Sequence, residues 1–408
     1  MKKVLVPRVR FKGFSEEWKE EKFGELLFRI NEKGYEFLET LTASKSGEML
    51  KRKSINYHIQ VAKESLKNYN RVLKNDFVLH LSTYESGLAY SKEIGITSPA
   101  YDVLRFFDKN NNDPIFFKYV FSNKKFINSL VPFTYGLRQG KSINLEELNK
   151  SLIEKTNVSE QQKIGKLLEN IDNLITLEEI KLNKLKQLKE TLLQKMFPEH
   201  NSKIPRIRFK GFEEEWKEER LEEIGQTYTG LSGKTKKDFG HGNSRYITYL
   251  NIFNNPIANL KGLDRIEKDC KQNSVKYGDI FVTTSSEIPE EVGMTSIWPF
   301  KDKENIYLNS FCFGIRLNNI NNYYINFLAY NLRNNELRKD IVLLAQGISR
   351  FNISNRRFMK LNILLPNISE QQKIGDFFSK IDILINLYNS KLNKLKQIKE
   401  SLLQKMFV

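Results

Sequence analysis

The chain has 408 residues. A chain of this length is too long to fold around a single hydrophobic core, so two or more domains are expected. Its 66 Lys and Arg residues against 49 Asp and Glu residues give a formal charge of +17, which favours a polyanionic partner, nucleic acid before an anionic membrane. Two cysteines exclude a disulfide framework, and no apolar run approaches the roughly 18 residues of a membrane span. The N-terminal MKKVLVPRVRF begins like a signal peptide, but Pro7, Arg8 and Arg10 interrupt its apolar run, so a cytoplasmic protein is expected.

Three motifs occur twice along the chain. In chain order they are PRVRFKGFSEEWKEEKFGE at 7–25 and PRIRFKGFEEEWKEERLEE at 205–223, SEQQKIG at 159–165 and 369–375, and KLNKLKQLKETLLQKMF at 181–197 and KLNKLKQIKESLLQKMF at 391–407. The repeats predict a first domain at 1–158, a long helix at 159–198, a second domain at 199–368 and a second long helix at 369–408. Between the motifs, both halves show strand-like runs around a G-[IM]-T-S turn, which predicts two mixed α/β domains of one scaffold and an α+β protein.

An apolar stripe at steps of three, four or seven residues predicts both long helices. The positions expected to pair the helices are Ile164, Leu168, Ile171, Ile175, Leu182 and Leu185 in the first copy and Ile374, Phe378, Ile381, Ile385, Leu392 and Leu395 in the second. Ser159 is the expected N-cap of the first helix. At ~1.5 Å per residue each helix is on the order of 55 Å long, and its expected partner is its own repeat.

Signatures of catalysis are missing from the sequence. The four histidines and two cysteines form no metal-binding spacing, and the H-E-x-x-H, G-x-S-x-G and G-x-G-x-x-G motifs do not occur. GLSGKTKKDFGHG at 230–242 resembles a phosphate loop, but Tyr228 occupies the position of the first P-loop glycine, so a basic DNA-contacting loop is the preferred interpretation. No catalytic residue and no metal site are predicted.

Clusters of basic, hydroxyl, amide and aromatic residues recur on Gly-rich loops in both halves. Lys, Ser and Thr suit phosphate oxygens, whereas Arg, Gln and Asn can bond two atoms of one base edge. Each residue taken singly is equally well explained as a solvated side chain, and Tyr135 and Tyr246 as core aromatics. The DNA-binding candidates of the first half are Lys45, Lys51, Arg52, Lys53, Ser82, Thr83, Tyr84, Tyr90, Lys92, Tyr135, Arg138, Gln139 and Lys141. Those of the second half are Lys234, Thr235, Lys236, Lys237, Asn243, Arg245, Tyr246, Thr284, Ser285, Gln346, Ser349, Arg350, Arg356 and Arg357.

The duplicated set of motifs resembles the specificity (S) subunit of type I restriction–modification systems over the whole chain. The matching segments are PRVRFKGFSEEW and PRIRFKGFEEEW, the SEQQKIG copies, and KLKQLKETLLQKMF. The resemblance implies two target recognition domains separated by two antiparallel coiled-coil helices, with internal pseudo-twofold symmetry and no catalysis in this chain. Two departures concern local loops, because Thr156 stands where the second half has Pro366, and Asn75 stands where it has Gly278.

The resemblance also implies the partners. They are double-stranded DNA, two methyltransferase (M) subunits that bind S-adenosylmethionine and methylate adenine, and restriction (R) subunits that use ATP and magnesium to cleave DNA. The segments kept alike should bind one partner twice, and the unlike domains should read the two halves of an asymmetric, split target. A spacer of ~55 Å corresponds to a gap of at most about 16 base pairs.

Two other hypotheses belong to different classes of protein. A stand-alone DNA-binding regulator with two unlike domains would function without partner subunits, which a pull-down would reveal. A fused methyltransferase or nuclease would act on DNA by itself when S-adenosylmethionine is added, and the missing cofactor and metal motifs argue against it. The two half-site sequences do not follow from the residues, since base readout depends on loop geometry and DNA deformation.

Overall fold

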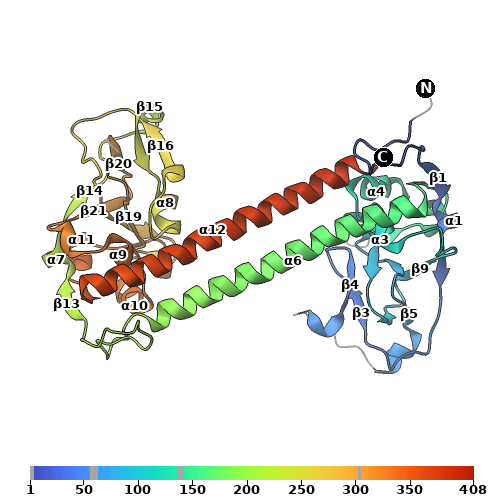
Figure 1. The fold of residues 1–408 in the computed structure, drawn as a ribbon, viewed down its shortest axis with the longest axis horizontal. Coiled ribbons are helices and arrows are strands. Elements are labelled where there is room, and N and C mark those ends of the chain that lie inside the picture. The colour runs from blue at the N-terminus through green and yellow to red at the C-terminus, as the bar shows by residue number, and fades with distance from the viewer. Residues whose placement is uncertain (1–3, 56–62, 136–141, 302–304) are drawn as a thin grey trace. The chain divides into compact units, whose positions relative to one another are not determined.

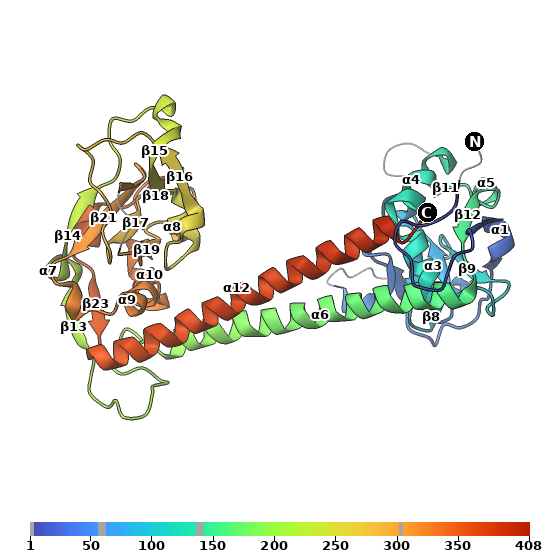
Figure 2. The same ribbon diagram turned by 45° about the horizontal axis from the view of Figure 1, so that its top comes forward.

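The computed structural model describes residues 4–55, 63–135, 142–301 and 305–408, and these form two compact units. Unit 1 comprises residues 1–179 and 390–408, and unit 2 comprises residues 180–389, so each unit takes residues from both halves of the sequence. Figures 1 and 2 trace the elements along the chain. The mixture of helices and strands confirms the predicted α+β class. Among the described residues, no helix is both long and apolar enough to span a membrane.

Unit 1 is built around a six-stranded sheet in the order β2-β9-β6-β7-β4-β3, antiparallel except for the β4–β7 pair. Its strands are β1 (Lys19–Lys22), β2 (Leu27–Ile30), β3 (Leu41–Ala43), β4 (Glu48–Lys51), β5 (Asn70–Val72), β6 (Phe77–Leu79), β7 (Ala89–Ser91), β8 (Gly95–Thr97), β9 (Asp102–Phe106), β10 (Thr134–Tyr135), β11 (Ser142–Ile143) and β12 (Leu152–Lys155). Its helices are α1 (Phe23–Leu26), α2 (Thr83–Ser86), α3 (Pro114–Phe121), α4 (Lys124–Ser129) and α5 (Leu145–Leu148). The first part of α6 (Val158–Lys195) and the last part of α12 (Ile368–Lys405) complete the unit.

Unit 2 contains a four-stranded sheet, β14-β21-β17-β19, and a three-stranded sheet, β16-β15-β20. Its strands are β13 (Lys217–Arg220), β14 (Gly225–Thr229), β15 (Phe239–Ile247), β16 (Leu263–Ile266), β17 (Ile280–Thr283), β18 (Ser285–Ser286), β19 (Thr295–Ile297), β20 (Ile306–Leu308), β21 (Cys312–Leu317), β22 (Phe351–Asn352) and β23 (Asn362–Leu365). Its helices are α7 (Leu221–Ile224), α8 (Tyr249–Asn254), α9 (Ile325–Asn331), α10 (Asn335–Leu343) and α11 (Asn355–Phe358), with the last part of α6 and the first part of α12.

The departure at Asn75 leaves the local turn intact. Asn75 adopts a φ of 74° where Gly278 has 81°, and asparagine tolerates this left-handed region better than most residues. The phenol of Tyr90 donates to the side-chain oxygen of Asn75 at 2.5 Å. The aspartate after each turn is equivalently bonded, because the backbone N–H groups of Leu73 and Lys276 both donate to it at 2.8 Å.

Helix α6 begins at Val158, one residue before the predicted cap Ser159, and α12 begins at the equivalent Ile368. The side chain of Asn157 accepts from the backbone N–H of Glu160 at 3.0 Å, and Asn367 accepts from that of Glu370 at the same distance. Ser159 therefore lies inside α6, and its prediction as the N-cap is wrong. The SEQQ motif indicates a helix start, but the capping residue is the asparagine two positions before it. The side chain of that asparagine accepts from the N–H of the motif glutamate, which has no partner inside the helix.

The SEQQKIG motif attaches each helix to its own domain. Gln161 accepts from the backbone N–H of Asp113 at 2.8 Å, and Gln371 accepts from that of Tyr324 at 2.9 Å. The motif glycines permit close packing, since a Cβ on Gly165 would lie 2.9 Å from the backbone nitrogen of Phe116, and one on Gly375 would lie 2.6 Å from that of Phe327. Glycine is therefore required where α6 crosses α3 and where α12 crosses α9.

A buried arginine–glutamate pair fixes the start of each helix to the segment that opens each half. Arg10 donates two bonds to Glu160, at 2.6 and 2.8 Å, and Arg208 donates two to Glu370, both at 2.7 Å. Both glutamate side chains have no exposed surface, and the hydrogen bond to the carboxylate raises the pKa of each arginine. These bidentate pairs account for the repeated PR[VI]RF and SEQQ letters.

The end of each helix completes the core of the unit that contains the other half's domain. In unit 1, Phe407 packs against Trp18 and Phe116, with ring centroids 6.1 and 5.5 Å apart. In unit 2, Phe197 packs in the same way against Trp216 and Phe327, at 5.9 and 5.8 Å. We call each assembly of arginine, glutamate, tryptophan and helix end a junction.

Backbone bonds hold the helix ends in the junctions. The N–H of Val9 donates to the carbonyl of Lys405, and the N–H of Ile207 donates to that of Lys195, both at 2.9 Å. Each bond satisfies a carbonyl that the end of a helix would leave free. The repeated KMF letters therefore serve the same packing in both units.

The helices run antiparallel within unit 1. Asp172 pairs with Lys399 at 2.5 Å, and Glu179 pairs with Lys396 at 2.7 Å, so residues later in α6 meet residues earlier in α12. In unit 2, Lys189 pairs with Asp382 at 2.5 Å. Several lysines that the sequence places beside the stripe thus carry ion pairs between the helices.

The apolar stripe is used in two ways. Ile164 and Leu168 belong to the core of unit 1, and Ile374, Phe378 and Ile381 belong to the core of unit 2, against which Leu185 and Ile385 also pack. Of the other predicted pairing positions, Ile171, Leu182 and Leu392 are buried and Ile175 and Leu395 are half-buried. The stripe thus covers the helix's own domain at its start as well as facing a second helix.

Removing one charge of a junction should destabilise unit 2. The Glu370→Gln substitution keeps the volume but leaves the buried guanidinium of Arg208 without its counter-charge, so we expect the free energy of unfolding to fall by ~3–5 kcal/mol. Urea unfolding of the full chain, with hydrogen exchange in α12 as the local probe, measures the change. The exposed pair of Glu222 and Arg220 gives the control, because Glu222→Gln should cost no more than ~1 kcal/mol. Equal stability of the two variants would contradict a structural role for the buried pair.

Candidate nucleic-acid interface

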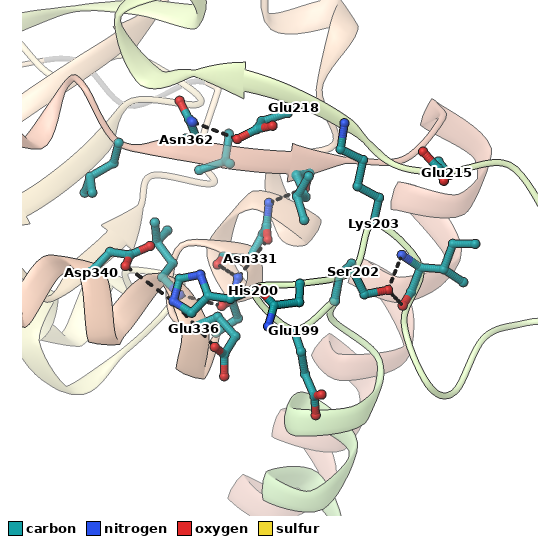
Figure 3. Close-up of a pocket in the computed structure, with 18 of the residues that line it drawn as sticks. Glu199, His200, Ser202, Lys203, Glu215, Glu218, Asn331, Glu336, Asp340 and Asn362 are labelled. Carbon is teal, nitrogen blue, oxygen red and sulfur yellow. Dashed lines mark hydrogen bonds and ion pairs between the residues drawn. The ribbon is translucent and has the colours of Figure 1, made fainter.

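One hollow of unit 2 is lined by acidic residues and is therefore unsuited to a polyanion. It has a volume of about 900 Å³ and lies against the segment at 198–204 that follows α6. His200 is 3.5 Å from Glu336 and 3.4 Å from Asp340, and Figure 3 shows further carboxylates around it. The acidic lining residues are Glu199, Glu215, Glu218, Glu336 and Asp340. A nucleic-acid surface of this unit must lie elsewhere.

Two predicted segments of unit 2 meet beside the end of β17. Strand β18 pairs with β22, with Ser285 opposite Asn352. A guanidinium nitrogen of Arg350 donates to the Ser285 hydroxyl at 3.1 Å, and the Thr284 hydroxyl donates to the carbonyl of Phe311 at 2.9 Å. We call Thr284, Ser285, Phe311 and Arg350 the arginine cluster. Ser285 is buried, so its hydroxyl orients the guanidinium, and its prediction as a DNA contact is wrong. Arg350 and Phe311 are exposed, and a fixed guanidinium beside an exposed ring suits contact with a phosphate or a base edge.

Four more predicted residues of the second half lie on either side of Arg350 in the sequence. The backbone N–H of Ile353 donates to the carbonyl of Thr284 at 2.9 Å, which fixes the approach to α11. Helix α11 carries Arg356 and Arg357, and both side chains are exposed. Gln346 and Ser349 lie in the preceding loop and are also exposed.

In the basic loop before β15, some cationic side chains are exposed to solvent and others form ion pairs within unit 2. Lys234 pairs with Asp269 at 2.8 Å, and this hydrogen bond, with others from the backbone of Lys271 and the side chain of Gln272, lowers the pKa of Asp269 to about 2. Thr235 bonds to Asp238 and closes the turn. The predicted residues that remain exposed are Lys236, Lys237, Asn243 and Arg245.

Tyr246 is half-buried on β15. Its ring packs against Phe239 at a centroid distance of 5.1 Å, and burial raises the pKa of its phenol. The side chain belongs to a small apolar cluster with Leu231, Ile266 and Tyr307, and its hydroxyl lies 3.5 Å from Asp264. These contacts favour the interpretation of Tyr246 as an aromatic residue that packs in the protein over its interpretation as a DNA contact.

The cations predicted in the first half are largely paired within unit 1. Lys53 pairs with Glu39 at 2.7 Å, Lys92 pairs with Glu48 at 2.9 Å, and Lys51 pairs with Glu93 at 3.3 Å. The guanidinium of Arg52 lies over the ring of Tyr69 at 5.8 Å, and Lys45 is exposed on the turn between β3 and β4. Exposed ion pairs of this kind contribute about 0–1 kcal/mol, so a phosphate can replace the carboxylate.

Two predicted contacts of the first half are wrong because their side chains are in the core. Thr83 has no exposed surface, and its hydroxyl accepts from the backbone N–H of His80 at 2.7 Å. Tyr90 is 1% exposed on β7 and packs against Phe77. Burial holds the neighbouring His80 neutral, with a pKa of about 4.

The remaining predicted residues of the first half lie near the surface or outside the described residues. Ser82 is exposed, Tyr84 is half-buried, and Tyr135 is 59% exposed on β10. Arg138, Gln139 and Lys141 lie outside the described residues.

Two exposed apolar residues near the arginine cluster are not among the DNA-binding candidates predicted from the sequence. Phe311 is 55% exposed in the arginine cluster, and Ile348 is 98% exposed in the loop before β22. The one available signal was the glycine at 347 beside basic and hydroxyl residues, which indicates a tight turn with an apolar residue at its tip.

The long helices present a second surface, which is apolar and occurs in both copies. Leu174 and Leu384, Leu177 and Leu387, and Leu188 and Ile398 occupy equivalent repeat positions, and all six are 42–60% exposed. On α6, Leu174 and Leu177 are three residues apart, so they lie on one face of the helix beside the apolar stripe. A repeated apolar face indicates a partner that binds twice.

The family comparison identifies the second half of the chain. Residues 213–397 match the family described as type I restriction modification DNA specificity domain. This stretch is less than half of the chain, and it is similar to the DNA specificity domain of that family. The predicted resemblance to specificity subunits is thereby confirmed. The first half repeats the junction of this specificity domain, with the same arginine, glutamate, tryptophan and helix-end residues in unit 1.

Similar proteins agree with this assignment. A curated type I restriction enzyme specificity subunit of Methanocaldococcus jannaschii is 25% identical over 202 residues, 48% of this chain and 46% of the relative, so the match spans about half the length of that relative. The crystal structure of the S subunit of a type I restriction-modification system from M. genitalium has 18% identity and a TM-score of 0.57 over 99% of both chains. A chain solved in work on complex assembly and conformational transition of the type I R-M system has 14% identity and a TM-score of 0.52, over 95% of this chain and 97% of that one. These structures establish the shared fold.

Removing exposed lysines should reduce the salt dependence of DNA binding. Each phosphate contact contributes about 0.9 to the slope of log K against log salt concentration, so the double variant Lys236→Gln, Lys237→Gln should lose up to about 1.8 from the slope. Fluorescence anisotropy of the full chain with labelled duplex DNA over a salt series measures the slope. Lys339→Gln is the control, because Lys339 pairs with Glu336 in the acidic hollow and should leave the slope unchanged. The same slope in the double variant and the wild-type chain would exclude both lysines from the interface.

Proposed function

We propose that the chain is the DNA sequence-recognition subunit of a type I restriction–modification complex and carries out no chemistry itself. One observation carries the proposal: the junctions are the same in both units, while the surfaces around them differ. A repeated framework suits a partner that binds twice, and unlike surfaces suit two different ligands. The similarity to type I specificity subunits supports this role.

Each unit reads one half of an asymmetric bipartite target. The surface of unit 2 offers arginines, at Arg350, Arg356 and Arg357, which can bond two atoms of a guanine. The candidate surface of unit 1 offers lysines held in ion pairs, which suit phosphate contacts. Two surfaces of such different chemistry favour two different half-site sequences, separated by a gap that the long helices set.

The repeated apolar face of α6 and α12 docks two methyltransferase subunits. These subunits bind S-adenosylmethionine and methylate adenine, and restriction subunits that use ATP and magnesium add DNA cleavage. The leucines on this face are exposed although the same helices bury their other apolar side, which supports a protein partner.

Exchange of one recognition domain tests the proposed function. The complex of this chain with its methyltransferase subunits should methylate a split sequence, detectable by methylation sequencing of host DNA with and without the chain. Replacing residues 25–155 by the matching segment of another specificity subunit should change one half of that sequence and leave the other intact. A change in both halves, or methylation by the chain alone with S-adenosylmethionine, would contradict the proposal.

A charge on the repeated apolar face should prevent methyltransferase docking. We expect Leu174→Asp combined with Leu384→Asp to reduce co-purification of the methyltransferase subunit at least tenfold, because a carboxylate would be buried without a partner. Asn183→Asp combined with Asn393→Asp is the matched control, since it adds the same two charges about 180° around each helix from Leu174 and Leu384. Quantitative pull-down measures the effect, and DNA binding by the chain alone verifies that it remains folded. Undiminished co-purification of the double variant would place the docking surface elsewhere.

A further inference from the structure

A short hairpin projects from unit 2 between α10 and α11. Its base is closed by two backbone bonds, in which Gln346 and Asn352 each donate to the other's carbonyl, at 2.9 and 2.8 Å. Gly347 has a φ of 139°, and a Cβ at this position would lie 2.0 Å from the carbonyl oxygen of Arg350. The turn therefore requires glycine, and this conformation presents the next residue, Ile348, at the tip.

The hairpin is held in place by the arginine cluster. Its second strand pairs with β18, and the guanidinium of Arg350 both donates to Ser285 and lies over the ring of Phe311 at 6.0 Å. The side-chain amide of Asn352 donates to the carbonyl of Arg350 at 3.3 Å. The tip is thus braced by backbone and side-chain contacts before any ligand binds, which reduces the entropy lost on binding.

Ile348 is 98% exposed, the highest value among the exposed large apolar residues of the described chain. Single exposed apolar residues are common on protein surfaces and by themselves indicate nothing. This one differs because a braced turn holds it outward and because its neighbours in the hairpin sequence, Gln346, Ser349 and Arg350, are polar or cationic. A protein-docking surface would need a wider apolar patch, whereas an apolar tip flanked by phosphate- and base-binding groups suits DNA.

We propose that Ile348 inserts between two stacked base pairs of the half-site read by unit 2. DNA-bending proteins use isoleucine, leucine and similar side chains as wedges that partly unstack one base step, while neighbouring cations hold the backbone. Arg350 and Ser349 lie beside the tip and supply those neighbouring groups. Flexible pyrimidine–purine steps unstack at the lowest cost, so the wedge selects such a step within the half-site. This proposal rests on the proposed function.

Base-by-base fluorescence tests the insertion. The full complex with its methyltransferase subunits is bound to target duplexes that carry 2-aminopurine at successive positions of the second half-site, outside the methylated adenine. With the wild-type chain, fluorescence should rise several-fold at one step. With Ile348→Ala this rise should disappear and the dissociation constant should increase about tenfold, whereas Ile348→Leu should retain both properties. Leu343→Ala, which removes another exposed apolar side chain from α10, is the control and should behave as wild type.

The outcomes separate this proposal from the proposed function. Binding and methylation by Ile348→Ala at wild-type levels, with the same fluorescence profile, would overturn the wedge and leave the recognition role intact. Lost methylation with unchanged DNA affinity and fluorescence would assign the tip to a protein contact and also overturn the wedge. A wild-type complex that binds no split target would refute the recognition role itself.

Discussion

The fold depends on a buried arginine–glutamate pair in each junction. Glu160 and Glu370 are fully buried, and a carboxylate in that position is stable only when its guanidinium is also present. The same opening segment binds the last carbonyls of the other half's helix, and the tryptophan beside it packs on that helix's final phenylalanine. Three segments must therefore be in place together. This requirement explains why the sequence repeats short motifs at the starts and ends of its halves and lets the rest diverge.

The junctions separate structural from recognition residues. Substitution affects folding at Arg10 and Trp18, because both side chains are almost fully buried. It also affects folding at Gly165, where a Cβ would clash with the backbone of α3. The loops that carry Arg350 or Lys236 make few contacts that the core requires, so their residues can change without loss of the fold. One framework can therefore hold the two different surfaces that are proposed to contact DNA.

The sequence predicted the regular and repeated parts of this structure. The helix stripes and the family resemblance follow from periodicity and from motif identity, which are local properties. The buried state of Thr83 and Tyr90 did not follow, because a hydroxyl that bonds to a nearby backbone group looks the same in sequence as one that faces solvent. The ion pairs of Lys51 and Lys92 join residues that are far apart in the chain, and only the tertiary structure reveals them.

The two surfaces proposed to contact DNA also differ in how much of their geometry is already formed in the free chain. In unit 2, one donor of Arg350 is already bonded to Ser285, which orients the planar guanidinium while other N–H groups remain for a ligand. In unit 1, Lys51, Lys53 and Lys92 must exchange a carboxylate for a phosphate, so the net gain from each contact is smaller and more dependent on salt. A preorganised arginine favours discrimination between bases, whereas lysines that exchange partners favour binding to phosphates, which positions the protein along the DNA backbone. The division of labour between the units therefore follows from side-chain chemistry on a shared framework.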